Sequence, residues 1–172
     1  MIRVCLHGSE STGKSTLALK LAARFTCPLV PEYGRIYAEA RDTDFAMADL
    51  LAIAREQDRL MCEAARGSPP LLLLDTDPLM TAAWAEMLFG EVPAELLGYP
   101  KAEWYLLFQP DVPWVADGTR CFGTPELRAH FAEVAEATLV RAGVPYQPIG
   151  GDWHERERQA MVAIQAISVS SN

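Results

Sequence analysis

Gly8-Ser9-Glu10-Ser11-Thr12-Gly13-Lys14-Ser15, followed by Thr16, is the stretch of this sequence that decides the fold. Residues 2–7 alternate between apolar and polar side chains just before it, which predicts a short strand. Apolar side chains at helical spacing predict a helix over residues 14–25. A strand, a glycine loop and a helix in this order are the context in which the pattern G-x-x-x-x-G-K-[ST] marks a phosphate-binding loop and not a chance match.

The residue types of this loop suit the binding of a nucleoside triphosphate. Gly8 and Gly13 permit the tight turn that points successive N–H groups at phosphate oxygens, and the following helix adds the positive end of its dipole. Lys14 can reach the β- and γ-phosphates, and the hydroxyl of Ser15 can ligate Mg²⁺. We therefore expect ATP and Mg²⁺ as ligands, with all residues from Gly8 to Thr16 forming the nucleotide site.

Length and composition indicate a single domain over residues 1–172. Half of the residues are hydrophobic, at 50%, yet no stretch is long enough to span a membrane. A net charge of −8 argues against nucleic acid as a partner, because binding to its backbone requires clustered Lys and Arg. The sequence begins directly with a strand, and its cysteines form no metal-binding pattern, so we expect a cytoplasmic protein. No pattern indicates an oligomeric state.

Strands and helices alternate along the rest of the chain. Apolar runs predict further strands at residues 29–30, 71–74, 104–108 and 146–149. Apolar spacing and capping residues predict further helices at residues 44–66 (with Asp44 as the N-cap), 78–89, 125–142 and 153–167. Residues 91–101 fit either a loop or a short helix, and residues 110–124 fit a lid-like loop. The alternation predicts an α/β domain of three layers, with helices on both faces of a parallel sheet.

Acidic side chains follow two of the predicted strands, at the edge of a parallel sheet where ligands bind. Asp75 comes after four leucines, a pattern typical of the carboxylate that lies near Mg²⁺. Asp77 can face the same cleft or cap the helix that begins at Pro78. Glu32 follows the second strand and can accept the proton of a hydroxyl that attacks the γ-phosphate, with Asp77 as the second choice for this role.

Two arginines and several aromatic residues are further candidates for the site. Arg35 and Arg120 can balance charge on the transferring phosphoryl group, and Arg120 is the stronger candidate because its glycine-containing loop could close as a lid. Tyr33 and Trp84 could stack on a flat ring of a substrate, although aromatic residues at helical spacing also form cores.

Four segments together resemble the ribosylnicotinamide kinase domain of NadR-type proteins. These segments are the phosphate loop, Glu32-Tyr33-Gly34-Arg35, Asp75-Thr76-Asp77 and the loop from Trp114 to Arg120 that contains Asp117. The resemblance extends to residues 143–146 and so spans nearly the whole chain. It implies a P-loop fold of the nucleoside and nucleotide kinases with strand order 2-3-1-4-5, here without the adenylyltransferase and DNA-binding domains of multifunctional members.

The same resemblance implies transfer of the γ-phosphoryl group of ATP to the 5′-hydroxyl of nicotinamide riboside. The implied catalytic residues are Lys14, Glu32, Asp77 and Arg120, and the implied metal-binding residues are Ser15 and Asp75. The implied contacts to the nucleoside come from Glu32, Tyr33, Arg35, Asp77, Trp84 and Asp117. Two alternatives stay open on the residues alone, namely a kinase for another nucleoside or vitamin-like alcohol and a regulatory ATPase without such an acceptor.

Overall fold

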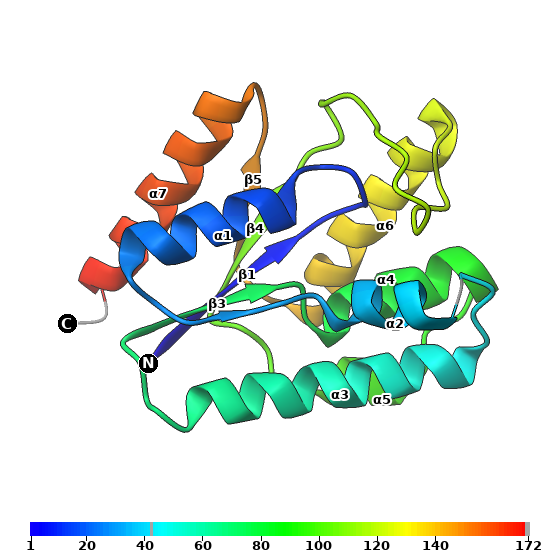
Figure 1. Ribbon diagram of the computed structural model, residues 1–172, viewed down its shortest axis with the longest axis horizontal. Coiled ribbons are helices and arrows are strands. Elements are labelled where there is room, and N and C mark those ends of the chain that lie inside the picture. The colour runs from blue at the N-terminus through cyan, green and yellow to red at the C-terminus, as the bar shows by residue number, and fades with distance from the viewer. Residues whose placement is uncertain (42, 171–172) are drawn as a thin grey trace.

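Five strands form one parallel sheet in the order β2-β3-β1-β4-β5 (Figure 1). This computed structural model describes residues 1–41 and 43–170, with side chains up to residue 167. The strands are β1 (Ile2–His7), β2 (Leu29–Val30), β3 (Leu71–Asp75), β4 (Trp104–Phe108) and β5 (Tyr146–Ile149). The sheet confirms both the parallel arrangement and the strand order that the resemblance implied.

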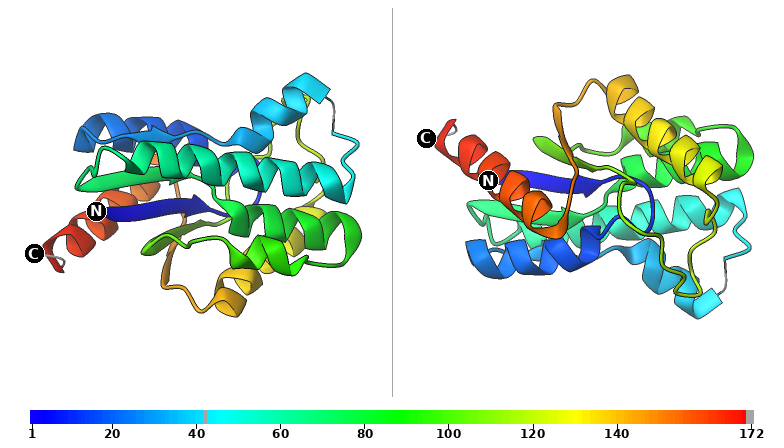
Figure 2. Two further views of the ribbon diagram at one scale, coloured as in Figure 1. Left: turned by 90° about the horizontal axis from the view of Figure 1, so that it is seen from below. Right: turned by 90° about the horizontal axis from the view of Figure 1, so that it is seen from above.

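Helices cover both faces of the sheet, as the alternation of elements predicted (Figure 2). The helices are α1 (Lys14–Phe25), α2 (Tyr33–Arg41), α3 (Met47–Ala65), α4 (Pro78–Phe89), α5 (Ala94–Gly98), α6 (Pro125–Ala142) and α7 (Trp153–Ser170). One face packs against α1 and α7, through residues such as Leu21 and Ile164. The other packs against α3, α4 and α6, through Met61, Leu79 and Leu139. This arrangement is the three-layer α/β fold of P-loop nucleoside kinases.

The four leucines of β3 show why this sheet is stable. β3 lies between β1 and β2 and is covered by helices on both faces, so Leu71 is only 8% exposed and Leu72, Leu73 and Leu74 are fully buried. A strand in this position loses water from both sides, which explains its continuous apolar run. Burial at the centre of the sheet also fixes the place where β3 ends, and therefore the position of Asp75.

Two features of the segment before α3 differ from the sequence prediction. The helix α2 was not predicted, because it is short, carries Gly34 near its start and buries only Ala38 fully. The predicted cap Asp44 is wrong, since α3 begins at Met47 and its N-cap is Ala46. The Asp49 carboxylate accepts a hydrogen bond of 2.8 Å from the Ala46 N–H, so an acid inside the first turn replaces a side chain at the cap.

β1 begins and α7 ends at one side of the molecule, while the phosphate loop and residues 110–124 lie toward the other (Figures 1 and 2). This separation follows from the parallel sheet, in which every strand ends at the same edge. Within the described residues, no helix is long and apolar enough to cross a membrane.

Candidate active site

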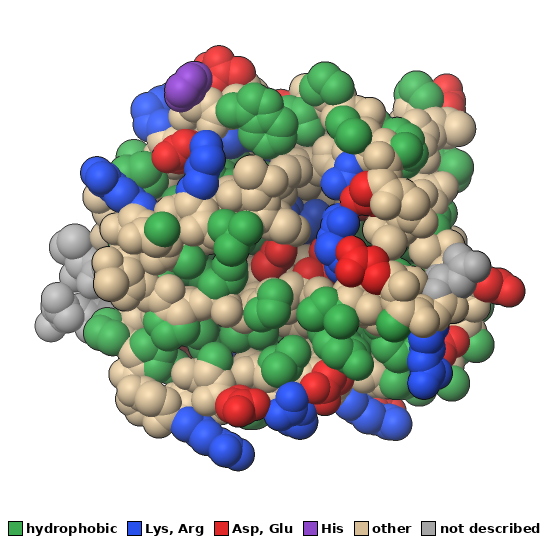
Figure 3. Space-filling model, viewed as in Figure 1, with side chains coloured by type: hydrophobic (Ala, Val, Ile, Leu, Met, Phe, Trp, Pro, Cys, Tyr) green, Lys and Arg blue, Asp and Glu red, His purple; other side chains and the backbone are tan. Residues whose placement is uncertain are grey.

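A cavity of about 370 Å³ opens at the carboxyl ends of the strands. Figure 3 shows acidic and basic side chains meeting at a hollow in the middle of one face. Most of the phosphate loop lines this cavity, together with Glu32, Arg35, Thr76 and Arg120. α2, α3 and α4 and the segment between α2 and α3 add an apolar wall, to which Ala38, Phe45, Leu50, Ile53, Met80 and Trp84 contribute. The volume lies in the range of small-molecule sites.

The phosphate loop requires both of its glycines. Gly8 has φ +130°, and a Cβ there would lie 2.6 Å from the carbonyl oxygen of Phe108. Gly13 has φ +84°, and a Cβ there would lie 2.3 Å from the indole ring of Trp153. Neither position can carry a side chain without moving β4 or α7, so close packing behind the loop adds to the need for a left-handed backbone.

Lys14 lies over the phosphate loop. Its Nζ donates to the Ser9 carbonyl oxygen at 2.7 Å and lies 3.4 Å from the Thr12 hydroxyl. Burial lowers the pKa of Lys14, while the negative charges of Glu32, Asp75 and Glu10 act to raise it. A buried ammonium beside these carboxylates is a strong attractor for phosphate oxygens, because little water screens the attraction.

Asp75 and Ser15 fit the requirements of a magnesium ion bound with a nucleotide. Burial raises the pKa of Asp75, and a hydrogen bond from the Ser15 hydroxyl acts to lower it. One carboxylate oxygen of Asp75, Oδ1, is buried and has no hydrogen-bond partner among the described residues. Mg²⁺ commonly takes one or two protein oxygens and fills its shell with water and phosphate oxygens. The described residues contain no cluster of three or more His, Cys, Asp or Glu side chains that could hold a metal ion.

Asp77 is the N-cap of α4. Its Oδ1 accepts the Leu79 N–H at 3.0 Å and so caps α4, while its Oδ2 accepts the Tyr105 hydroxyl at 2.5 Å. Thr76 between the two acids has φ +71°, a strained value for a β-branched residue. Asp77 is only 1% exposed and is not among the described residues that line the cavity. This placement favours the capping alternative over the catalytic and substrate-binding roles predicted for Asp77.

Glu32 lies at the end of β2, where Gln57 of α3 holds the chain on both sides of it. The side-chain amide of Gln57 accepts the Tyr33 N–H at 2.8 Å and donates to the Pro31 carbonyl oxygen at 3.2 Å. Burial raises the pKa of Glu32, and the charge of Asp75 adds to the effect, whereas Lys14 and Arg35 act to lower it. Gln57 is 2% exposed and also reaches the Thr76 carbonyl oxygen, so one buried amide joins the ends of β2 and β3. The sequence patterns did not predict this role for Gln57.

Two side chains of the phosphate loop, those of Glu10 and Ser11, hold the loop of residues 110–124 in place. The Glu10 carboxylate accepts the N–H groups of Cys121 and Phe122 at 3.2 and 2.6 Å. The Ser11 hydroxyl accepts the Val115 N–H and Nη1 of Arg120, both at 2.9 Å. Burial raises the pKa of Glu10, while these backbone hydrogen bonds act to lower it. Glu10 and Ser11 were predicted to bind nucleotide, and here they bind the lid-like loop.

Arg35 and Arg120 both bind Asp117. Oδ2 of Asp117 lies 2.8 Å from Nη1 of Arg35 and 2.9 Å from Nε of Arg120. Although burial acts to raise it, hydrogen bonds from Arg35 and Thr119 and the charge of Arg120 lower the pKa of Asp117 to about 2. The structure thus brings both predicted arginines to the cavity, and it assigns Asp117 to holding them.

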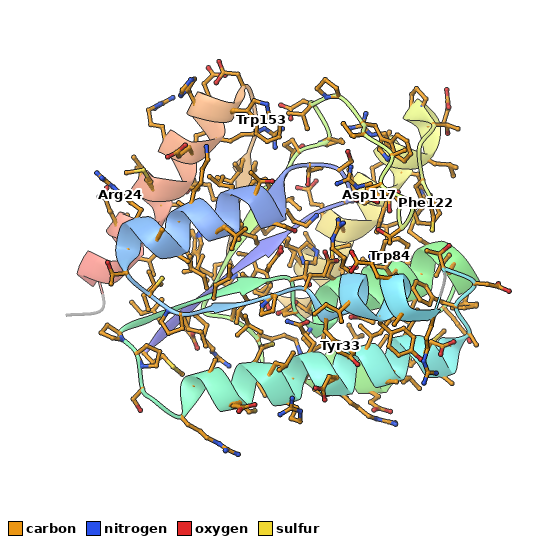
Figure 4. The ribbon with its side chains drawn as sticks, in the orientation of Figure 1. Arg24, Tyr33, Trp84, Asp117, Phe122 and Trp153 are labelled. Carbon is orange, nitrogen blue, oxygen red and sulfur yellow. The ribbon has the colours of Figure 1, made fainter. Side chains whose placement is uncertain are left out.

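The two aromatic candidates, Trp84 and Tyr33, differ in whether they line the cavity. Trp84 lines the cavity and packs against Phe122 of the lid-like loop and Phe131 of α6, at centroid distances of 5.3 and 4.9 Å. Figure 4 shows Trp84, Phe122 and Asp117 on the same side of the molecule. Tyr33 instead packs edge-to-face on Tyr37 and joins the apolar cluster of α2, α3 and α4. Among the described residues that line the cavity Tyr33 does not appear, which favours the core alternative for its ring.

Arg156 is a further residue that the sequence patterns did not single out. Its side chain is fully buried, and its guanidinium donates to the Thr12 carbonyl oxygen of the phosphate loop at 3.1 Å. Sequence patterns treat a charged residue on an amphipathic helix as solvent-facing. Arg156 lies one turn after Trp153, near the start of α7, and Trp153 is itself exposed, so no nearby residue in the sequence indicates that Arg156 is buried.

The fold and the cavity define a P-loop nucleotide-binding protein with the architecture of nucleoside kinases. The chain belongs to the family described as "AAA domain", which it matches over residues 3–156. It is also 31% identical over 150 residues to the "Trifunctional NAD biosynthesis/regulator protein NadR" of Escherichia coli (strain K12). That similarity covers 83% of this chain and 37% of the relative, so the chain spans little more than a third of the relative's length. The resemblance to NadR-type proteins inferred from the sequence motifs is confirmed.

Solved structures of NadR and of a nucleoside kinase have a similar fold. A crystal structure of NadR protein in complex with NR has a TM-score of 0.78 at 24% identity and covers 96% of this chain and 51% of that one. Deoxyadenosine kinase from M. mycoides has a TM-score of 0.70 at 8% identity and covers 96% of this chain and 100% of that one. At these low sequence identities, the structural similarity establishes the fold alone.

Proposed function

We propose that this protein is an ATP-dependent kinase that phosphorylates the 5′-hydroxyl of nicotinamide riboside, giving nicotinamide mononucleotide and ADP. One observation carries the proposal. A single cavity contains the phosphate loop, a carboxylate of raised pKa at Glu32, and an apolar wall that includes Trp84. Similarity to NadR, which one crystal structure holds in complex with NR, supports nicotinamide riboside as the acceptor.

The nucleotide would bind along the phosphate loop, with Lys14 near the β- and γ-phosphates and the loop N–H groups around them. Ser15 and Asp75 would hold Mg²⁺, which neutralises phosphate charge when bound. The buried, unpartnered oxygen of Asp75 supports this assignment.

Glu32 would act as the general base. Its raised pKa suits a carboxylate that must accept a proton near neutral pH. In the transfer, the 5′-oxygen forms a bond to the γ-phosphorus while the bond from that phosphorus to the β,γ-bridging oxygen breaks. The hydroxyl proton passes to the Glu32 carboxylate, and ADP leaves with the bridging oxygen.

Arg120 and Arg35 would both approach the transferring phosphoryl group, while Asp117 keeps both guanidinium groups in place. The lid-like loop would exclude water, which otherwise competes with the hydroxyl for the phosphoryl group. Trp84 would form one wall for the nicotinamide ring, whose positive charge is attracted to aromatic faces and to nearby carboxylates.

An assay of ADP release with purified protein, ATP and Mg²⁺ tests the proposal. Nicotinamide riboside should raise the rate far above the rate with ATP alone, and mass spectrometry should detect nicotinamide mononucleotide in equal amount. The Lys14→Met variant is the matched control for contaminating kinases and should be inactive. Turnover with another nucleoside but not with nicotinamide riboside would contradict the proposed acceptor. Equal ADP release with and without every nucleoside would instead identify an ATPase.

A further inference from the structure

Arg156 of α7 contacts the phosphate loop from behind the cavity. Its Nη1 donates to the Thr12 carbonyl oxygen at 3.1 Å, and its Nε donates to the Gly151 carbonyl oxygen at 2.8 Å. Its Nη2 donates to the Gln109 carbonyl oxygen at 3.0 Å and forms an ion pair with Asp111. One side chain therefore joins the phosphate loop, the segment after β4, the beginning of the lid-like loop and the turn before α7.

The bond to Thr12 fixes the direction of a peptide group in the phosphate loop. A trans peptide is planar, so its carbonyl oxygen and the N–H of the next residue point in opposite directions. Because the Thr12 oxygen is held by Arg156, the Gly13 N–H points away from Arg156. Trp153 of the same helix lies against Gly13 on the side where a Cβ would stand. Two residues of α7 thus constrain the Thr12–Gly13 peptide, one residue before Lys14.

Stability alone accounts poorly for this arrangement. Burial lowers the pKa of Arg156, but a guanidinium stays charged in proteins, so the fold carries a buried cation. Buried ion pairs contribute little net stability, because the loss of hydration offsets the attraction. Asp111 is half-exposed and also accepts the Gly151 N–H at 2.7 Å, so it supplies the counter-charge while ordering the same turn. The bonds of Arg156 determine geometry more than they determine the free energy of unfolding.

We infer that Arg156 is a positioning residue for the nucleotide. It holds the Thr12–Gly13 peptide in the orientation that binds phosphate and, through Asp111, ties the phosphate loop to the root of the lid-like loop. The inference rests on the proposed function only in that the cavity binds ATP, and it is independent of the acceptor.

Titration calorimetry with ATP and Mg²⁺, in the absence of acceptor, tests this inference directly. Arg156→Gln should weaken ATP binding by about tenfold or more, since hydrogen bonds to a charged group are lost. Arg156→Lys should give an intermediate affinity, because an ammonium can satisfy some of the carbonyl oxygens without the planar fork. Arg158→Gln is the matched control, since Arg158 lies on the same helix and is exposed, and it should bind ATP as the wild type does.

The kinetic parameters separate positioning from a general loss of structure. In Arg156→Gln the KM for ATP should rise, while the KM for the acceptor at saturating ATP stays within about twofold of the wild-type value. A folded Arg156→Gln protein that binds ATP within about twofold of wild type would overturn the inference. If Arg156→Gln does not fold, Asp111→Asn provides the test, because Asp111 is half-exposed and Asn keeps an acceptor for Gly151. Unchanged ATP affinity in that variant would also overturn it.

Failure of the proposed function gives a different result. If the wild type binds ATP but does not phosphorylate nicotinamide riboside, the assigned acceptor is wrong and the role of Arg156 stands. A wild type that binds no ATP in calorimetry overturns both.

Discussion

Asp117 and Arg35 are 82 positions apart in the sequence, yet Oδ2 of Asp117 accepts a hydrogen bond of 2.8 Å from Nη1 of Arg35. The same oxygen lies 2.9 Å from Nε of Arg120. Arg35 belongs to α2 beside the end of β2, whereas Asp117 and Arg120 belong to the lid-like loop. A single carboxylate therefore connects the lid-like loop to α2, which begins directly after Glu32, and we expect catalysis to depend on it.

Asp117→Asn should loosen this connection. The neutral amide loses the charge that attracts both guanidinium groups, so the lid-like loop should exclude water less well. We expect the KM for the acceptor to rise about fivefold and ATP hydrolysis without acceptor to rise about threefold. Parallel measurements of ADP and nucleotide product give both values. Glu126→Gln, at an exposed position at the start of α6, is the control. If Asp117→Asn has the same KM for the acceptor and the same rate of ATP hydrolysis as this control, Asp117 does not hold the lid-like loop.

Glu32→Gln should remove the general base and lower kcat by about 100-fold or more. In the wild type, kcat/KM should fall as the pH drops through the raised pKa of Glu32, because the carboxylate must be ionised to accept the proton. That fall should occur at a higher pH than for an ordinary glutamate, and it should be absent from Glu32→Gln. Rate profiles against pH for both proteins check this prediction. The exposed Glu39→Gln on α2 is the matched control and should keep the wild-type profile.

Gln57→Met should impair turnover without removing any group that contacts the phosphates. It leaves the Tyr33 N–H and the Pro31 carbonyl oxygen, both part-buried, without their partner, which should loosen the chain at this point. The backbone on both sides of Glu32 is then less well held, so kcat should fall about tenfold while the affinity for ATP is retained. Stopped assays and calorimetry measure the two quantities, and Gln165→Met on the exposed face of α7 serves as the control. Equal losses of ATP affinity and kcat would count against a local effect on Glu32.

Asp77→Asn should change the pH dependence of stability more than it changes catalysis. Burial raises the pKa of Asp77 from its ordinary value of 3.8 to about 6, although hydrogen bonds from Tyr105 and Leu79 act to lower it. Between these two pH values the folded protein keeps a proton that the unfolded chain has lost. The free energy of unfolding contributed by Asp77 therefore falls as the pH rises through this window.

Asparagine is also a good N-cap, so Asp77→Asn should fold. Its free energy of unfolding should not show this fall with rising pH. Urea unfolding at several pH values measures it, with the exposed Asp44→Asn as the control. We expect kcat of Asp77→Asn to stay within about threefold of the wild-type value, since general-base loss costs 100-fold or more. A folded variant with a loss of that larger size would restore the catalytic role predicted from the sequence.

Glu10→Ala should release the lid-like loop from the phosphate loop. The N–H groups of Cys121 and Phe122 would lose their shared acceptor, so the loop should open more often. Trypsin should then cut after Arg120 about threefold faster or more, provided that cleavage follows the population of the open form. Mass spectrometry of the fragments at timed intervals gives the rate. Glu10→Gln keeps one acceptor oxygen, so its cleavage rate should lie between those of the wild type and Glu10→Ala. Equal cleavage rates in all three proteins would show that Glu10 does not hold the loop.

Local patterns predicted most of the fold. The helices at residues 14–25, 78–89 and 125–142 were predicted with the bounds that the structure shows, and the strand predicted at residues 71–74 ends one residue before β3 does. Each of these depends on turn chemistry, capping or periodicity among neighbours in the sequence. The helix predicted at residues 153–167 continues to Ser170 as α7, and the stretch left open at residues 91–101 contains α5. The larger differences, α2 and the start of α3, depend on packing against other elements and on an acid inside the first turn.

The candidate site was predicted only in part. Lys14, Glu32, Arg35, Trp84 and Arg120 line one cavity, as the positions of the strand ends suggested. Sequence patterns left open whether Asp77 faces the cleft or caps a helix, because its partner Tyr105 is distant in the sequence. They could not show Gln57 or Arg156, since each acts on backbone groups that are distant in the sequence.

The sequence by itself determined that this chain binds phosphate through a P-loop and builds a parallel α/β sheet, because both depend on residues that are close together along the chain. Only the tertiary structure decided which charged side chains work together. Asp117 meets Arg35, Glu10 meets Phe122 and Arg156 meets Thr12 across 82, 112 and 144 positions. Such contacts form because folding removes these groups from water and requires each buried donor and acceptor to find a partner wherever the chain brings one.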